Sequence, residues 1–261
     1  MTDYSPQPTL HPRLLHPPFA RIACVIDADA ESLHAVEQTL AIADTDAHVT
    51  FAAFRPGLAE RVEEALSRAR EAGLDPERQK PDAASPEEGL ARLTATHDLV
   101  VIGAPTHARA TGIVLGDAAT RLVHRSPIPV LIARERPLVD GVVAATRAHP
   151  ADRAALIAGA RIAARLGAEL TVVHVEERDD QTREPELQAE LANTRALLGR
   201  PLNVLRPKGP VARGIVDVAD GDGAGLVVLG SRLRVGLPAL TSVSERVAHH
   251  APCSVLIMRG R

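Results

Sequence analysis

Aromatic residues are almost absent from this sequence. It has one Tyr, three Phe and no Trp, so aromatics make up 2% of its residues. A surface that binds nucleic acid usually needs aromatic side chains for stacking and an excess of basic residues, whereas the net charge here is −3. We therefore expect no nucleic-acid partner. The core must be built from Ala, Val, Leu and Ile, which suits helices packed on a parallel sheet.

Long apolar runs and cysteines are also scarce. No apolar run approaches the ~20 residues needed to cross a bilayer, and the N-terminus lacks the charged and apolar regions of a secretory signal. Cys24 and Cys253 each lie in or beside an apolar run, so we expect two reduced, buried thiols rather than a disulfide. These features predict a cytoplasmic protein with no membrane partner.

Prolines crowd the N-terminal segment, residues 1–20, and they exclude a helix or a central strand there. We interpret the segment as an extended, proline-rich arm. It could be disordered or could lie across a neighbouring surface, and the sequence leaves both open.

From Arg21 onward, β-branched runs alternate with amphipathic segments. The predicted strands of the first half are residues 21–27, 48–54, 98–103 and 128–134, and the predicted helices are residues 32–43, 58–72, 86–96 and 118–125. Gly73 is expected to follow the end of the second helix. Residues 75–86 are polar and contain prolines, which argues against another strand there.

The same alternation then starts again. The predicted strands of the second half are residues 141–145, 169–175, 203–206, 226–230 and 254–259, and the predicted helices are residues 152–166, 184–198, 211–219 and 242–250. Asp152 is expected to cap the first of these helices and Gly167 to end it.

The two halves end on similar sequences, SPIPVLIAR (126–134) and APCSVLIMR (251–259). An internal repeat of about 125 residues is one domain in each copy. Strands that alternate with helices predict right-handed crossovers and a parallel sheet. We therefore predict an α/β fold of two tandem, doubly wound, Rossmann-like domains, at residues 21–136 and 140–261.

A glycine at each end of a loop follows the strand DLVVIG in the first half, at Gly103 and Gly116. In doubly wound sheets, ligands bind beyond the carboxyl ends of the strands. A glycine there allows close approach of a ligand, and the start of the next helix offers free N–H groups to a phosphate. Two ordinary turn glycines are the alternative interpretation.

The order of these features resembles the universal stress protein family. The resemblance is carried by VID ending the first strand, by Gly103, Thr106, Gly116 and Asp117 at the spacing G-x2-G-x9-G-(Ser/Thr), and by the final PVLIA strand. It covers residues 21–261 in two copies and implies an adenine nucleotide alpha hydrolase-like fold. In ATP-binding members, the aspartate that ends the first strand contacts the adenosine, and the glycine loop with its Ser/Thr holds the phosphates.

The first half matches this pattern only in part. The resemblance implies nucleotide contacts at Asp27, Ala28, Phe54, Gly103 and Gly116. Thr106 replaces the second glycine, and Asp117 replaces the Ser/Thr. A carboxylate about 4 Å from a phosphate would repel it by on the order of 4 kcal/mol per unit charge at an effective dielectric constant of about 20. We therefore expect the first half to keep the adenosine end of the site and to reject a triphosphate.

The second half departs from the pattern at other positions. Thr146 is placed where the family has its aspartate, Leu233 stands at the second glycine, and Ser242 is kept with Glu245 at capping-box spacing. Arg232 and Arg234 add positive charge to the loop. The remaining candidate contacts of this half are Val175, Gly230, Val243 and Ser244. A capped helix with a basic loop and a weak anion site both stay open, and we expect the two sites to lie on separate sheets.

Signals of catalysis or metal binding are weak. The sequence has no G-x-S-x-G, H-E-x-x-H or G-x-x-x-x-G-K-(S/T) motif. Zinc at His249, His250 and Cys253 is disfavoured because adjacent helical histidines point in different directions. Mg²⁺ at Asp27, Asp29 and Glu31 competes with a helix first turn, and His107 and His124 suit a solvated loop and helix. We expect no metal site.

The sequence therefore predicts a non-enzymatic stress-response or regulatory protein with a degenerate nucleotide site. Genuine binding of ATP or AMP by one repeat, and a weak ATP hydrolase, are the alternatives. By the resemblance, Val130–Ala133 and Val255–Met258 would pair within the chain, so that one polypeptide equals a family dimer. Further association into a homodimer and an unknown protein partner stay open.

Overall fold

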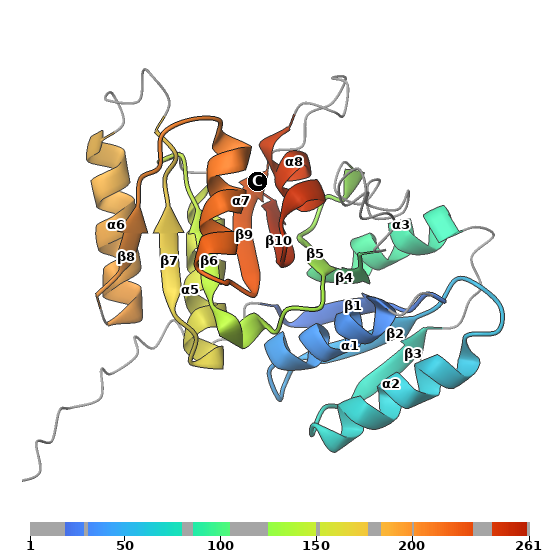
Figure 1. The fold of residues 1–261 in the computed structure, drawn as a ribbon. Coiled ribbons are helices and arrows are strands. Elements are labelled where there is room, and N and C mark those ends of the chain that lie inside the picture. The colour runs from blue at the N-terminus through green and yellow to red at the C-terminus, as the bar shows by residue number, and fades with distance from the viewer. Residues whose placement is uncertain are drawn as a thin grey trace, which may run out of the picture.

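The computed structural model describes residues 19–28, 31–79, 86–104, 125–149, 152–176, 184–199, 201–231 and 242–259. These residues form one twisted sheet with helices on both faces (Figure 1). The predicted α/β fold with mostly parallel strands is confirmed. The predicted helix at 118–125 lies outside the described residues except for Arg125, and so does the N-terminal arm up to residue 18.

The described residues of the first half form five strands. They are β1 (Arg21–Val25), β2 (His48–Ala52), β3 (Pro76–Gln79), β4 (Leu99–Gly103) and β5 (Val130–Ala133). The helices between them are α1 (Glu31–Ile42), α2 (Ala59–Glu71) and α3 (Pro86–Thr96). The argument against a strand at 75–86 is wrong, because Pro76–Gln79 pairs with β2. A strand that pairs on one side only can remain polar and can tolerate a proline.

The second half repeats this arrangement after a short 3-10 helix at Leu138–Asp140. Its strands are β6 (Val142–Ala145), β7 (Leu170–Val173), β8 (Asn203–Leu205), β9 (Leu226–Ser231) and β10 (Ser254–Arg259). Its helices are α5 (Arg153–Leu166), α6 (Glu184–Leu198), α7 (Val211–Gly221) and α8 (Val243–His250). Gly167 is left-handed, with φ of 65°, and ends α5 as predicted.

All ten strands belong to one sheet, in the order β3-β2-β1-β4-β5-β10-β9-β6-β7-β8. Within each half every pair is parallel, and the halves join through the antiparallel pair β5–β10. The expected pairing of these two final strands within one chain is therefore present. The expectation of two separate sheets is wrong, because the final strands complete a single hydrogen-bonded ladder.

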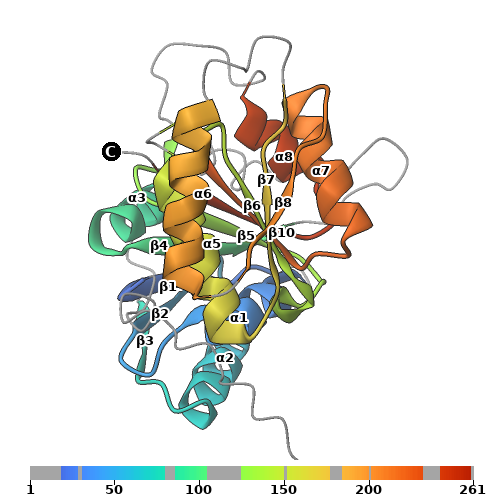
Figure 2. The same ribbon diagram turned by 90° about the vertical axis from the view of Figure 1, so that its left-hand side faces the viewer.

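Two hydrophobic clusters cover the two faces of this sheet. One contains buried residues of α1, α2, α5 and α6, and the other contains buried residues of α3, α7 and α8. In the second half, α5 and α6 lie on one side of the strands and α7 and α8 on the other (Figure 2). Because the same helices occupy the same faces in both halves, the strand ends of the two halves can be compared position by position.

Candidate functional site

Strand order reverses between β1 and β4 in the first half and between β6 and β9 in the second. In doubly wound sheets, the crevice at the carboxyl ends of such neighbouring strands is the usual ligand site. The strands of the two halves run in opposite directions because β5 and β10 are antiparallel. The two candidate ligand positions therefore lie at opposite ends of the strands of one sheet and do not form a shared site.

In the first half, Asp27 follows β1 at this crevice. Its carboxylate is 40% exposed and lies 3.5 Å from the Arg55 guanidinium. The backbone N–H of Ala28 donates to Asp27 Oδ1 over 2.7 Å, and Arg61 donates to the Asp27 carbonyl over 3.2 Å. The carboxylate thus keeps an accessible oxygen face, with arginines beside it that the sequence analysis did not single out.

Gly103 ends β4 next to this aspartate, but it approaches protein rather than an open space. A Cβ on Gly103 would lie 2.5 Å from the Glu31 carbonyl oxygen and 3.0 Å from the Ser32 nitrogen. The glycine is therefore required by the close packing of the first turn of α1 against the end of β4. The idea that it admits a ligand is not needed to explain it.

Phe54 and Val175 occupy equivalent positions in the two halves. Phe54 comes two residues after the β2 residue that pairs with the end of β1, and Val175 comes two residues after the β7 residue that pairs with the end of β6. A Cβ on Gly89 of α3 would lie 2.1 Å from the Phe54 ring, and one on Gly214 of α7 would lie 2.9 Å from Val175 Cγ2. In both halves, a glycine in a helix leaves room for the apolar side chain that the sequence proposed as a nucleotide contact. These side chains serve as packing against a helix.

In the second half, the strand register shows that Arg147, not Thr146, occupies the position that Asp27 has in the first half. Ala145 pairs with Val173 and Leu229 just as Val25 pairs with Ala52 and Ile102. Thr146 is buried, and its hydroxyl accepts the N–H of Ala148 over 3.1 Å. The placement of Thr146 at the aspartate position is therefore wrong by one residue, and a cation replaces the carboxylate.

Asp152 holds this arginine instead of capping α5. Its carboxylate is 3% exposed and lies 3.2 Å from the Arg147 guanidinium, which is 46% exposed. It also accepts the backbone N–H of Arg147 over 3.0 Å, and no side-chain bond to the helix N–H groups is formed. The predicted capping role of Asp152 is wrong because the carboxylate turns back to the strand end.

Ser242, Ser244 and Ser231 form a chain of hydroxyls at the carboxyl end of β9. Ser242 caps α8 by accepting the N–H of Glu245 over 3.2 Å, as its spacing predicts. Ser244 donates to Ser231 over 3.0 Å and lies 3.3 Å from the Ser242 hydroxyl. Gly230 precedes Ser231 in β9, and Val243 begins α8. The start of α8 thus has its hydroxyls engaged with one another.

Several candidates cannot be placed. Thr106, Gly116, Asp117 and Arg232 lie outside the described residues, as do Asp29, His107, His124, Leu233 and Arg234. Their nucleotide contacts stay predictions. Arg55 and Arg147 are the residues at these crevices that the sequence analysis missed. Only the strand register, which the sequence does not give, identifies Arg147 as the residue that matches Asp27.

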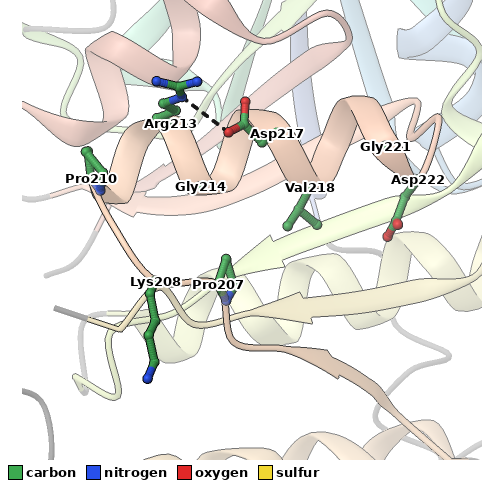
Figure 3. Close-up of a pocket in the computed structure, with 9 residues that line it drawn as sticks. All are labelled: Pro207, Lys208, Pro210, Arg213, Gly214, Asp217, Val218, Gly221 and Asp222. Atoms are coloured by element: carbon green, nitrogen blue, oxygen red, sulfur yellow. Dashed lines mark ion pairs between the residues drawn. The ribbon is translucent and has the colours of Figure 1, made fainter.

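A pocket of about 620 Å³ lies beside α7, and its lining residue Gly214 packs close to Val175. It is lined by Pro207, Lys208, Pro210, Arg213, Gly214, Asp217, Val218, Gly221 and Asp222 (Figure 3). Two cations and two carboxylates line it, and Arg213 pairs with Asp217 at 3.4 Å. This balanced, shallow lining gives no preference for an anion or a cation, and none of the candidate nucleotide residues belongs to it.

Metal and thiol chemistry have little support at these strand ends. Within the described ranges, no group of three or more His, Cys, Asp and Glu could hold a metal ion. Burial raises the pKa of Cys24 to about 12 and that of Cys253 to about 11, so both remain thiols near neutral pH. Of the helices that the structure describes, none is both long and apolar enough to cross a membrane.

The sheet topology defines a Rossmann-like α/β protein in which one doubly wound unit occurs twice in a continuous sheet. Residues 140–259 match the model of the Universal stress protein family. The second half of the chain is therefore similar to this family. A search of curated proteins found no match.

Solved structures extend the likeness in fold to both halves. A universal stress protein from Archaeoglobus fulgidus superposes with a TM-score of 0.72 at 19% identity, over 92% of this chain and 98% of the other. A putative universal stress protein from Pseudomonas aeruginosa UCBPP-PA14 gives 0.70 at 19% identity, over 93% and 94%. A functionally unknown protein from Pseudomonas aeruginosa PAO1 gives 0.71 at 20% identity, over 93% of both chains. At these identities the likeness shows the fold alone.

Proposed function

We propose that the chain is a tandem universal stress protein that acts in a stress response as a regulatory protein and catalyses no reaction. The family match of residues 140–259 supports the family role. The shared strand order of the two halves supports a tandem protein. A cytoplasmic location fits the two free, buried cysteines, because disulfides are favoured in oxidising compartments and rare in the cytosol.

The difference between Asp27 and Arg147 carries the proposal of a degenerate site. A carboxylate after the first strand can accept hydrogen bonds from the hydroxyls of a ribose, whereas a guanidinium only donates. Arg147 is also committed to Asp152 by an ion pair of 3.2 Å and by the bond from its own backbone N–H. The second half therefore lacks the acceptor that a nucleoside would need at this position.

The first half keeps the acceptor but carries Asp117 where a phosphate-binding Ser/Thr is expected from the family pattern. A fixed negative charge at that point opposes a phosphate group. Each half would thus keep one part of a nucleotide site, and the two parts lie at opposite ends of the strands of the sheet. The combination supports a protein that signals through contacts with a partner rather than through turnover of a nucleotide.

Calorimetric titration of the full chain with ATP-Mg and with AMP, together with a phosphate-release assay, tests this proposal. We expect no saturable binding below about 1 mM, which corresponds to about −4 kcal/mol of binding free energy, and no phosphate release above background. Micromolar binding of ATP would contradict the degenerate site. Phosphate release that Asp27→Ala abolishes would contradict the non-catalytic role.

Genuine binding of ATP or AMP in the first half is the second candidate function. The 40% exposed carboxylate of Asp27 at the strand-order reversal favours it. It requires one site per chain that Asp27→Ala removes and Arg147→Ala leaves unchanged. AMP would then bind more tightly than ATP, because a shorter phosphate chain carries less charge toward Asp117.

A further inference from the structure

A local twofold relation joins the two halves at their final strands. Leu131 of β5 lies opposite Leu256 of β10, with Ile132 opposite Val255 and Val130 opposite Ile257. Arg134 and Arg259 hold equivalent positions. Arg134 comes one residue after the β5 residue that pairs with Gly103 of β4, and Arg259 comes one residue after the β10 residue that pairs with Gly230 of β9. Both arginines are buried, at 6% and 9% exposure.

Arg134 crosses from the first half to the end of α8 in the second half. Its Nη1 donates to the Cys253 carbonyl over 3.0 Å, and its Nη2 donates to the Ala248 carbonyl. Its backbone N–H donates to Ser254 Oγ over 3.0 Å, and Gln38 of α1 donates to its carbonyl. One first-half residue thus binds three second-half residues and is itself held by α1.

The chemistry of this contact suits a helix C-terminus. The last carbonyls of a helix have no partner within it, and the macrodipole places partial negative charge there. Burial lowers the pKa of Arg134 to about 10, so the guanidinium still carries its charge near neutral pH. A buried cation that donates to one of these helix carbonyls, that of Ala248, and to the Cys253 carbonyl just beyond the helix therefore holds the helix end in place.

The other end of α8 carries candidate residues of the second half. Val243–His250 makes a helix of about two turns, too short to bend appreciably between its ends. Ser242 and Ser244 at its start bond to Glu245 N–H and to Ser231 of β9. A shift of the C-terminal carbonyls is therefore passed directly to the hydroxyls at the N-terminus.

We propose that Arg134 is a positioning residue supplied by the first half, which places α8 and thereby the Ser242–Ser244 end of the second-half site. The second-half site is then incomplete without the first half. This inference rests on the proposed function, because it concerns how the same candidate site is positioned. It does not require that the site bind ATP.

Amide hydrogen exchange of the full chain without ligand tests the placement of α8. In Arg134→Met, we expect the amides of residues 246–250 to exchange at least about tenfold faster than in the wild type, while α5 keeps its protection. Arg259→Met is the matched control, because it removes the equivalent buried arginine at the other end of the twofold relation. Unchanged α8 exchange in Arg134→Met, or equal acceleration in both variants, overturns the proposal.

Arg134→Lys separates positioning by the charge from simple packing. A lysine at this buried place would have its pKa lowered by desolvation, and its neutral form would attract the Ala248 carbonyl much more weakly than its charged form. We expect protection of α8 to be partly restored near pH 7 and to fall, relative to the wild type at the same pH, as the pH rises to about 9. A pH-independent ratio, as a packing role predicts, overturns the proposal.

Titration with ATP-Mg distinguishes failure of this inference from failure of the proposed function. The exchange experiments decide the role of Arg134 whether or not any nucleotide binds. If ATP-Mg does bind and the binding requires Ser242, the degenerate site is wrong, and Arg134→Met must then weaken it at least about tenfold, or about 1.4 kcal/mol. Equal affinity in Arg134→Met and Arg259→Met would count against Arg134 instead.

Discussion

The two halves have the same backbone turn after their first strand, but the turn carries a negative charge at Asp27 in the first half and a positive charge at Arg147 in the second. In the first half, Ser32 Oγ accepts the N–H of Asp27 over 2.7 Å, and in the second half Asp152 accepts the N–H of Arg147 over 3.0 Å. In each case the acceptor lies five residues further along the chain, at the start of the next helix. The turn geometry is therefore retained while the charge at the candidate ligand position is reversed.

A second difference lies at the opposite ends of the central strands. Asp98 and Gly225 hold equivalent positions. The N–H of Asp98 donates to the carbonyl of Arg21 at the start of β1, and the N–H of Gly225 donates to the carbonyl of Gly141 just before β6. Asp98 also accepts the Arg21 N–H with its carboxylate over 2.9 Å. Gly225 instead lies under Pro137 of the segment that links the halves. The segment that links the halves therefore leaves no room for a side chain at this position.

Gly225→Ala should have the largest effect of the substitutions that compare the halves. A Cβ at Gly225 would lie 1.8 Å from the Pro137 carbonyl oxygen and 2.7 Å from its carbon. Because backbone must move, we expect a loss of about 3 kcal/mol or more in the free energy of unfolding. Asp98→Ala, the equivalent change in the first half, should cost only about 0.5 to 1 kcal/mol for an exposed hydrogen bond.

Urea unfolding measures both changes, and Gly223→Ala is the control. Gly223 has a positive φ of 64° and open space around its Cβ position, so its substitution should cost about 1 to 2 kcal/mol from backbone strain alone. A Gly225→Ala protein as stable as the Gly223→Ala protein would mean that the linker can move away freely, and that the two halves are less firmly joined here than the structure indicates.

Asp152→Ala should have the next largest effect. The change leaves the Arg147 N–H and guanidinium without a buried charged acceptor, for which we expect a loss of about 2 kcal/mol. Ser32→Ala removes the equivalent neutral acceptor in the first half and should cost about 1 kcal/mol. Asp152→Asn keeps an oxygen acceptor and should fall between the two. Equal losses for Asp152→Ala and Ser32→Ala would show that the charge at this turn adds no stability.

The sequence was sufficient for the helices that the structure describes and for the strands buried on both faces, because their residues carry a clear apolar pattern. It was insufficient for β3, whose Pro76–Gln79 segment pairs only with β2 and leaves its middle residues exposed. An edge strand needs few apolar residues, so its pattern is weak. The prediction that Asp152 caps α5 was wrong for another reason. A carboxylate before a helix can accept either the first N–H groups of the helix or, as here, an N–H group that follows the preceding strand.

The candidate site was harder to predict because it depends on register and on distant contacts. Thr146 and Arg147 could both follow a strand in the sequence, and only the pairing of Ala145 with Leu229 decides which one matches Asp27. Arg134 is an ordinary strand-end arginine in the sequence, while its partners Ala248 and Cys253 lie more than a hundred residues away. Such contacts follow from how the halves join, which local patterns do not encode.

Substitutions of Ser242 should have a smaller effect and test the comparison with Asp117. Ser242→Ala removes the cap of α8 and should cost about 1 kcal/mol, whereas Ser242→Asp should change stability by only a few tenths, since Asp caps as well as Ser. Thermal unfolding checks both values. A large loss in Ser242→Asp would mean that this helix start cannot hold a carboxylate, and that Asp117 cannot be an equivalent cap in the first half.

The smallest expected effect is a pH dependence that comes from His97, a buried histidine of the first half. His97 is buried, bonds to Thr50 Oγ1 over 3.0 Å, and has its pKa lowered mainly by burial, whereas the second half has buried Ala224 before the equivalent strand. The unfolded histidine takes up a proton as the pH falls below about 6.5, while the folded one resists protonation. The free energy of unfolding should therefore fall as the pH drops from 7 through that range, until the lowered folded-state pKa is passed. His97→Gln should show a smaller difference between pH 7 and about pH 5 in urea unfolding, and an unchanged difference would assign the acid sensitivity to other histidines.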